Sequence, residues 1–323
     1  MAMAMASRTL TSVPRILPLY ARAAAPLLPG ASLLPFVPGG GGEVPELELE
    51  LSGVRADAAA VAAYARVCGF ALRDHLPPTY PQVLAFPLHL AVMADGSFPF
   101  GAVGLVHLEN RIVQRRPIGL DEELTLRVRP TKLRPHPKGR TFTLETEALA
   151  GGEAAWESVS TMLRRGRPSS DADSPAERGE TRSSQERGFE VLPTGAPASA
   201  EWRLGGDLGR RYAAVSGDRN PIHMHPLTAK PLGFPAAIAH GMWTKARCLG
   251  ALESRLPDAF SVDVRFRKPI LLPGRVEFAS SIDEAGEILF AVRDAERQVP
   301  HLDGLVRPAE GRKKAKTGGK KAR

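Results

Sequence analysis

Long hydrophobic runs are missing from this chain. Its apolar segments are interrupted by proline, glycine or charge well before the roughly 18 residues that a membrane-crossing helix requires. Cysteine is also scarce, and its two residues, Cys68 and Cys248, both lie in apolar patterns typical of helices. Such positions favour reduced, buried thiols over a disulfide, as in a reducing compartment. The composition therefore predicts no membrane contact and a cytoplasmic location.

The body of the chain has almost no net charge, although the formal net charge of the whole chain is +8. Residues 307–323 hold eight Lys or Arg and one acid, so they account for +7 of this total. We expect residues 308–323 to be a basic, disordered tail, with weak contact to anionic surfaces as the alternative, and no nucleic-acid partner. A phosphate-binding loop is absent too, because the glycine run at 39–42 is not followed by Lys-Ser or Lys-Thr.

Acidic residues are absent from the first 42 positions, which hold three arginines and six prolines. A basic, acid-free beginning can be an organellar transit peptide. The prolines argue against the single long amphipathic helix that such a peptide forms. We expect residues 1–42 to be an irregular N-terminal arm.

A regular pattern begins at residue 43. Residues 46–53 alternate acidic side chains with leucine, which is typical of a strand with one buried face. An Ala-rich helix follows Asp57, a second apolar helix covers 81–94, and four strand patterns run from there to residue 163. The segment at 165–190 is rich in Ser, Arg, Glu and Gly, so we expect a disordered linker.

The same order of elements returns after the linker. A short strand pattern at 199–204 precedes a helix at 207–217, a second helix at about 235–252, and four more strands. Short segments of the amino-acid sequence repeat as well, at offsets of 148, 154 and 152 residues. The matched segments are Tyr64–Phe70 with Tyr212–Asp218, Tyr80–Ala85 with Phe234–Ala239, and Arg115–Ile118 with Arg267–Ile270. The chain is therefore expected to contain two copies of one fold, at 43–164 and 191–307.

Polar side chains gather between the two helices of the second copy. Asp218, Asn220 and His223 stand around Pro221, which disfavours a helical conformation at the preceding residue, so a stiff turn is expected. The next apolar run predicts a buried helix with Gly241 near its start. A backbone N–H at that position can bind an oxyanion.

This stretch resembles the signature of the MaoC-like dehydratases, the family of R-specific enoyl-CoA hydratase 2. The resemblance rests on Tyr212, Ser216-Gly217-Asp218, Asn220-Pro221-Ile222-His223 and His240-Gly241. It implies a hot-dog fold for each copy. The chain would then be an α+β double hot-dog, with two antiparallel sheets joined edge to edge and each wrapped on a central helix. Either a monomer that is itself a pseudo-dimer or a homodimer fits this expectation.

The resemblance also implies a reaction, the reversible hydration of trans-2-enoyl thioesters to (R)-3-hydroxyacyl thioesters. Asp218 and His223 would grip and activate one water, and the N–H near Gly241 would stabilise the enolate oxygen. The remaining motif residues are assigned structural roles: Tyr212, Ser216, Gly217, Asn220, Pro221 and His240.

The first copy lacks these groups. Phe70 stands in place of Asp218, and Phe86-Pro87 stands in place of His240-Gly241. We therefore expect one active site per chain. The resemblance implies that the first copy, which is not catalytic, makes room for a long or bulky acyl chain.

No cofactor is expected, because the substrate would arrive as a thioester of CoA or of acyl carrier protein, the latter being a candidate partner. Arg219, Lys230, Lys245 and Arg247 are candidates to bind this thioester handle. No metal is expected either, because His223 and His225 in a strand-like segment would point to opposite sides. Two alternatives stay open, a hot-dog acyl-thioesterase and a catalytically silent subunit that binds acyl thioesters.

Overall fold

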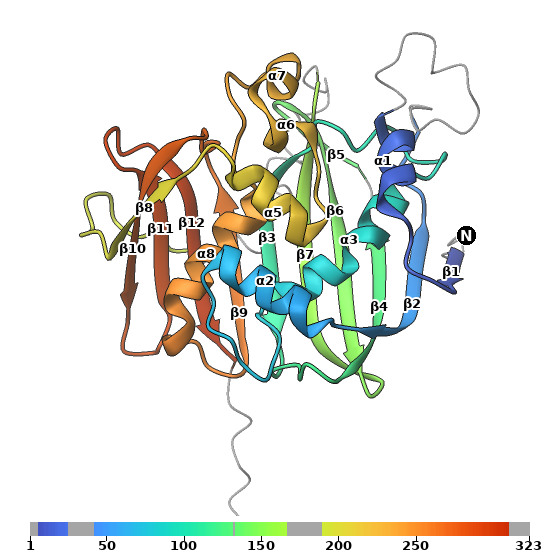
Figure 1. Cartoon of the computed structure of the whole chain (residues 1–323), viewed down its shortest axis with the longest axis horizontal. Helices are drawn as coiled ribbons and strands as arrows, with labels where there is room; N and C mark the ends of the chain where they lie inside the picture. The colour runs from blue at the N-terminus through green and yellow to red at the C-terminus, as the bar shows by residue number, and fades with distance from the viewer. Residues whose placement is uncertain (1–5, 25–41, 132, 167–188, 310–323) are drawn as a thin grey trace, which may run out of the picture.

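The computed structural model describes residues 6–24, 42–131, 133–166 and 189–309, which form one large sheet with helices on one face (Figure 1). The strands are β1 (Ala6–Leu10), β2 (Leu47–Arg55), β3 (Val106–Gln114), β4 (Glu123–Pro130), β5 (Arg134–His136), β6 (Gly139–Ala150), β7 (Glu153–Arg165), β8 (Ala200–Leu204), β9 (Phe260–Phe266), β10 (Gly274–Ile282), β11 (Ile288–Asp294) and β12 (Pro300–Pro308). The helices are α1 (Ile16–Ala24), α2 (Ala58–Cys68), α3 (Tyr80–Met93), α5 (Leu208–Ser216), α6 (Pro221–Met224), α7 (Pro226–Ala229) and α8 (Gly241–Leu252), with 3-10 turns η4 (Lys230–Leu232) and η5 (Glu253–Arg255).

The sheet repeats one strand order in its two halves. The first half runs β2-β4-β6-β7-β3 and the second β8-β10-β11-β12-β9, so strands of equal rank occupy equal places. The halves meet where β3 pairs antiparallel with β9, from Glu109 opposite Arg265 to Gln114 opposite Phe260. The predicted double hot-dog, with sheets joined edge to edge, is confirmed.

Each half carries a short helix and a longer one. The short helices α2 and α5 both end at a glycine in the left-handed conformation, Gly69 with φ 80° and Gly217 with φ 76°. A side chain at such a position is strained, so glycine ends both helices at the same point of the repeat. The longer helix α3 packs on β2, β4 and β6, and α8 occupies the corresponding place in the second half (Figure 1).

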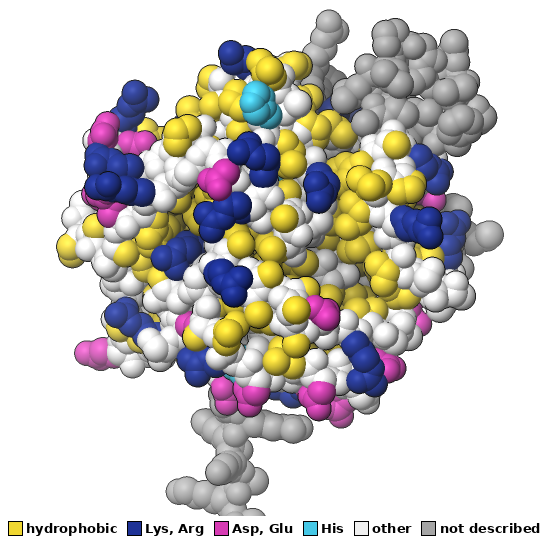
Figure 2. Space-filling view, viewed as in Figure 1, with side chains coloured by type: hydrophobic (Ala, Val, Ile, Leu, Met, Phe, Trp, Pro, Cys, Tyr) yellow, Lys and Arg dark blue, Asp and Glu magenta, His cyan; other side chains and the backbone are white. Residues whose placement is uncertain are grey.

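The core is continuous across the joint between the halves. Trp156, Tyr64 and Phe142 are buried in the first half, and Phe260 and Phe290 in the second. On the helix-bearing face, basic and acidic side chains are interspersed among exposed apolar atoms (Figure 2). Among the described helices, none combines the length and the apolar character needed to cross a membrane.

The prediction of an irregular N-terminal arm is wrong for residues 6–24. Strand β1 pairs in parallel with β2, so it satisfies the hydrogen-bonding groups along that edge of the sheet. Helix α1 tolerates proline because Pro18 lies in its first turn, where a backbone N–H has no helical partner. The rest of the arm, most of the predicted linker and nearly all of the predicted tail lie outside the described residues.

The second helix of the second copy is shorter than predicted. It begins at Gly241 instead of about residue 235, because the preceding backbone is extended. There the N–H of Ile238 donates to the carbonyl of Ile222, and the N–H of Ala239 donates to that of Ile270. These bonds hold the segment away from a helical path and place the start of α8 beside the polar turn.

Candidate active site

The polar turn is built by the end of α5 and the start of α6. Gly217 has a positive φ, and a Cβ there would lie 2.7 Å from the Cδ1 atom of Ile16. Asn220 has a non-helical backbone with φ −54° and ψ 126°, as expected before a proline, and Pro221 then begins α6. His223 therefore sits on a helical turn, and the strand-like segment predicted around it is wrong. The ring of His225 instead accepts a hydrogen bond from the N–H of Leu227 at the start of α7.

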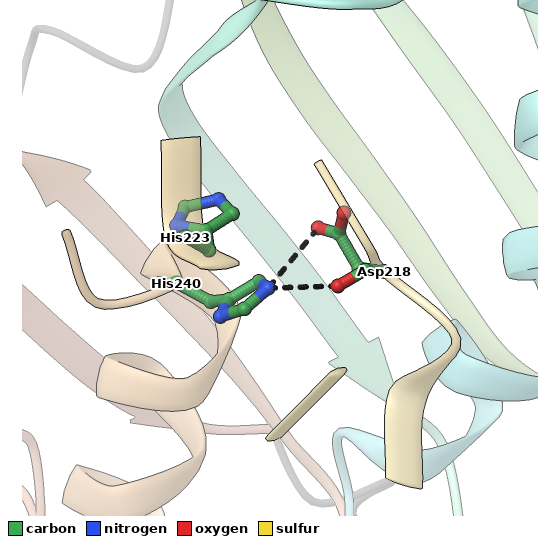
Figure 3. A group of neighbouring side chains, drawn as sticks. All are labelled: Asp218, His223 and His240. Carbon is green, nitrogen blue, oxygen red and sulfur yellow. Dashed lines mark hydrogen bonds and ion pairs between the residues drawn. The ribbon is translucent and has the colours of Figure 1, made fainter. Parts of the chain in front are cut away.

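Asp218, His223 and His240 come together at this turn (Figure 3). Each offers one nitrogen or carboxylate oxygen, and these atoms lie within 4.8 Å of one another. The rings of His223 and His240 stack, with centroids 3.6 Å apart and planes 23° apart. His240 Nε2 lies 3.0 Å from the main-chain oxygen of Asp218 and 3.9 Å from its Oδ2 atom. The sequence had assigned His240 a structural role only.

The two oxygens of the Asp218 carboxylate have different surroundings. Oδ1 accepts the hydroxyl of Tyr20 at 3.0 Å and the N–H of Asn220 at 3.1 Å. No hydrogen bond to Oδ2 is found among the described residues. Burial raises the pKa of Asp218, but the neighbouring imidazoles and these two hydrogen bonds outweigh it and lower the pKa below its ordinary value. The carboxylate is therefore ionised at neutral pH, and its Oδ2 accepts no hydrogen bond from the described residues.

Both histidines are neutral at physiological pH. Burial lowers the pKa of His223, and burial together with the neighbouring His223 lowers that of His240 to about 3. His223 Nδ1 lies 2.8 Å from the carbonyl oxygen of Ile238, which can only accept, so Nδ1 carries the hydrogen and Nε2 is a bare acceptor. By the same reasoning His240 Nε2 carries its hydrogen, and its buried Nδ1 has no partner among the described residues.

The first residue of α8 is Gly241, so its N–H has no partner inside the helix. A Cβ at this position would lie 3.1 Å from the ring of Phe266, and glycine allows that close approach. His240, just before it, is extended, and its carbonyl receives the N–H of Thr244. The α8 N-terminus thus presents a backbone donor beside the histidine pair.

A cavity of about 460 Å³ adjoins these groups. The second half contributes Asp218, Asn220, His223, His240 and Gly241 to its wall, and the first half contributes residues 105–108 with Met162 and Leu163. A smaller cavity of about 90 Å³ also reaches Asp218. Its wall comes mostly from the first half, including Gln82, Phe86, His89, Met93 and Leu144.

The first half presents no comparable group at the matching positions. Phe70 is buried and stacks on Tyr64 with ring centroids 6.5 Å apart. Pro87 lies inside α3, where it has no N–H to offer. Among the motif residues of the second half, Tyr212 packs its ring 4.8 Å from that of His240. Ser216 donates its hydroxyl to the carbonyl of Tyr212 and accepts the N–H of Asp218.

The predicted handle residues do not line the large cavity. Lys245 is wholly buried, with its ammonium bonded to Asn110 and to the carbonyl of Val262, so it cannot contact a ligand that stays at the surface. Arg247 lies over the ring of Trp202, 4.7 Å from its centroid. Arg219 and Lys230 are exposed but are not part of the cavity wall. The assignment of these four residues to the thioester handle stays a prediction.

The basic residues that do line the large cavity were not singled out from the sequence. They are Lys138, Arg165, Arg267 and Lys268, all exposed, with His136 and His301 beside them. They come from the β5–β6 hairpin, the end of β7 and the segment after β9, so no local motif joins them. Tyr20 was missed for the same reason, since it lies 198 residues from Asp218 in the chain.

Asp218, His223 and His240 have the ligand types and the spacing of a metal site among the described residues. Two of their imidazole nitrogens are already engaged by main-chain carbonyls, which leaves Nε2 of His223 and Nδ1 of His240 as ligand atoms. Two neutral imidazoles and a carboxylate suit a transition metal. They suit a water held for deprotonation equally well. The prediction that the chain uses no metal stays a prediction.

Known proteins resemble the chain in sequence and in structure. A family model described as MaoC like domain matches residues 200–303. The 3-hydroxyacyl-thioester dehydratase X of Mycobacterium tuberculosis is 38% identical over 277 residues, covering 86% of this chain and 94% of that protein. The (R)-specific enoyl-CoA hydratase of Aeromonas caviae is 30% identical over 89 residues, covering 26% of this chain and 66% of that protein. A crystal structure of HtdX from M. tuberculosis superposes with a TM-score of 0.69 at 36% identity, covering 81% of this chain and all of that one.

Proposed function

The chain belongs to the MaoC-like dehydratase family, and on that premise we propose that it catalyses the reversible hydration of trans-2-enoyl thioesters. The product would be the (R)-3-hydroxyacyl thioester, and the reverse reaction would be its dehydration. The observation that carries the proposal is the pair of bare acceptors, Oδ2 of Asp218 and Nε2 of His223, on the wall of one cavity. An acyl chain and a water both need access to such a pair.

The two acceptors can hold one water by both of its hydrogens. As the water oxygen forms its bond to C3, one proton passes to Asp218 Oδ2, and the other hydrogen stays on the new hydroxyl. The electron pair of the C2–C3 double bond moves toward the thioester, where negative charge collects on the carbonyl oxygen. The proton held at the Asp218–His223 pair then passes to C2. Both additions come from one face of the alkene, so the hydration is syn.

The enolate oxygen needs a donor that is already in place. The free N–H of Gly241 at the start of α8 supplies one, and the helix dipole favours negative charge there. A donor of this kind is commonly worth about 2.7 to 4 kcal/mol in the transition state. The ring of His240 stacks on that of His223 and holds the His223 imidazole in its orientation. Because His240 is neutral, it adds no positive charge.

The acyl chain is proposed to extend toward the first half. The two cavities share four wall residues, His107, Met162, Asp218 and Met242, so a chain leaving the reaction centre can continue from one into the other. The thioester handle would leave by the side that carries Lys138, Arg165, Arg267 and Lys268. Phosphate groups are common to CoA and to the prosthetic group of acyl carrier protein, and these basic side chains fit either.

The proposal is tested by the loss of enoyl absorbance when the purified protein meets crotonyl-CoA and longer trans-2-enoyl-CoA substrates. Activity should be present in the unchanged chain and absent in Asp218→Asn and His223→Ala. Chiral analysis of the product should give the R isomer. Full activity in both variants would overturn the site. Release of free thiol without hydration would favour a thioesterase, and tight binding without turnover at every chain length would favour a silent binding subunit.

A further inference from the structure

Tyr20 brings the N-terminal segment into contact with the candidate base. Its hydroxyl lies 3.0 Å from Oδ1 of Asp218 and 2.7 Å from the main-chain nitrogen of Arg219. The nitrogen can only donate, so the phenolic oxygen accepts from Arg219 and gives its own hydrogen to the carboxylate. Both ends of the tyrosine hydroxyl are therefore committed to the loop that carries Asp218.

We propose that Tyr20 is a positioning residue for the Asp218 carboxylate, supplied to the active site by the segment 6–24. Together with the N–H of Asn220, its hydroxyl occupies Oδ1 and fixes the plane of the carboxylate. Oδ2 is thereby left for the water that reacts. This role rests on the proposed function, because it matters only if Asp218 acts as the base.

Strand pairing and helix packing fix the position of the segment 6–24, and with it the Tyr20 hydroxyl. Strand β1 pairs with β2 along five residues, and α1 packs against α3. Ile16 lies against Gly217, and the Tyr20 ring lies 6.5 Å from that of Phe86 in a tilted arrangement. Figure 1 shows α1 beside one end of α3. Because Phe86 also lines the smaller cavity, the same packing joins α1 to the wall of the acyl site.

Tyr20 cannot replace Asp218 as the base. Burial and the adjacent carboxylate raise its pKa far above the ordinary value, so the hydroxyl stays protonated. A hydrogen bond from a neutral donor stabilises the ionised carboxylate and costs some of its basicity. Its benefit is geometric, since a displacement of about 1 Å at a reacting group can cost roughly 100-fold in rate.

The charge state of Asp218 depends on all the groups that face it. These are Tyr20 from α1, His223 from α6, His240 before α8, and the backbone of Arg219 and Asn220 in its own loop; His107 on β3 also interacts with its charge. Tyr20 can be changed to Phe without altering either histidine of the pair. Removing its hydroxyl takes away one bond to the ionised form, so the pKa of Asp218 should rise.

The test compares Tyr20→Phe with the unchanged chain and with Leu17→Ala. Leu17 lies on the same helix and is 73% exposed, so its truncation should leave kinetics and stability unchanged. Tyr20→Phe keeps the ring that packs near Phe86 and removes only the hydroxyl. We expect kcat to fall by about 10- to 100-fold, with KM for the enoyl-CoA changing less than about twofold. The acid limb of the kcat/KM profile should move to higher pH.

Thermal unfolding of each variant separates positioning from folding. A Tyr20→Phe protein with unchanged melting temperature, reduced kcat and a shifted acid limb supports the proposal. Unchanged kcat and an unchanged acid limb would overturn it, as would a loss of activity explained by unfolding at the assay temperature. Asp218→Asn in the same assay keeps two failures apart. If Asp218→Asn retains full activity, the proposed function fails. If Asp218→Asn loses activity but Tyr20→Phe has the kinetics of the unchanged chain, this inference alone fails.

Discussion

The ammonium of Lys245 lies 2.6 Å from Oδ1 of Asn110, and this contact joins the two halves at the centre of the sheet. Lys245 also donates to the carbonyls of Asn110 and Val262, on β3 and β9. The amide nitrogen of Asn110 in turn donates to Ser158 and Ser160 of β7. A buried lysine in this position lies where β3 and β9 meet and satisfies acceptors on both strands.

Removal of one partner from this cluster should destabilise the fold. Burial already lowers the pKa of Lys245 well below its ordinary range. In Asn110→Leu the Lys245 side chain keeps its two carbonyl acceptors and loses its shortest hydrogen bond. We therefore expect the free energy of unfolding to fall by about 3 kcal/mol. Urea unfolding measures this change. The double variant Asn110→Leu/Lys245→Met should recover part of the loss, because it removes the buried amine as well.

Lys230→Met is the matched control, since Lys230 is exposed on η4. Its stability should stay within about 0.5 kcal/mol of the unchanged chain. If Asn110→Leu proves equally neutral, Lys245 does not depend on this amide.

Loss of the Asp218 charge should abolish hydration without unfolding the protein. Asn keeps the size of the side chain but cannot take a proton from water, so kcat should fall by about 10²- to 10⁴-fold. The control is Asp207→Asn, an exposed residue before α5 whose side chain makes no cap bond. Initial rates with a trans-2-enoyl-CoA measure both. A comparable loss in the two variants would point to a general effect of charge instead of base catalysis.

Acid should weaken the fold through histidines whose pKa values are lowered by burial. Burial lowers the pKa of His89 to about 4 and is the main cause that lowers those of His107 and His240 to about 3. The unfolded chain binds these protons near the ordinary value of 6.5, so the stability is fully present above that pH and declines as the pH falls toward 3 or 4. Each histidine contributes a slope of up to about 1.4 kcal/mol per pH unit.

Urea unfolding between pH 7 and 5 checks this decline. In His89→Gln the amide can keep the hydrogen bond that His89 makes to Thr146, yet it cannot titrate. The slope should then decrease, because one titrating imidazole has been removed. A stability that does not change between pH 7 and 5 would contradict burial of neutral imidazoles.

The basic side chains around the large cavity should affect KM for the enoyl-CoA more than kcat. Lys268 is exposed and lines this cavity, whereas Lys230 is exposed and does not. We expect Lys268→Ala to raise KM for an enoyl-CoA by about fivefold with little change in kcat, since an exposed charge pair is worth about 1 kcal/mol. Its KM should also respond less to added salt. A larger effect from Lys230→Ala would return the handle site to the residues suggested by the sequence.

The repeated pattern made most of the architecture predictable. Equal strand orders follow from equal element orders, and Gly69 and Gly217 end α2 and α5 at matching positions in both copies. The bend at Pro221 was predictable because a proline restricts its neighbour locally. That restriction was enough to anticipate that Asp218 and His223 would lie close together.

Contacts between distant segments were not predictable. Tyr20 reaches Asp218 only after β1 and α1 have packed, and nothing in its local pattern signals a polar partner. Lys245 was suggested as a handle residue, but it lies on α8 and its ammonium contacts Asn110 at the joint between the halves. The start of α8 was misplaced because backbone bonds from Ile238 and Ala239 to remote carbonyls outweigh local helical preference.

The seam between β3 and β9 lies within a single polypeptide. A pair of identical subunits would carry every substitution twice, once beside the reacting water and once where the tail of the substrate is accommodated. In this chain, under the proposed function, a change on α3 is expected to reshape the space for the tail while Asp218 and His223 stay unchanged. Under the proposed function, substrate choice could then be altered through α3 without any substitution at Asp218, His223 or His240.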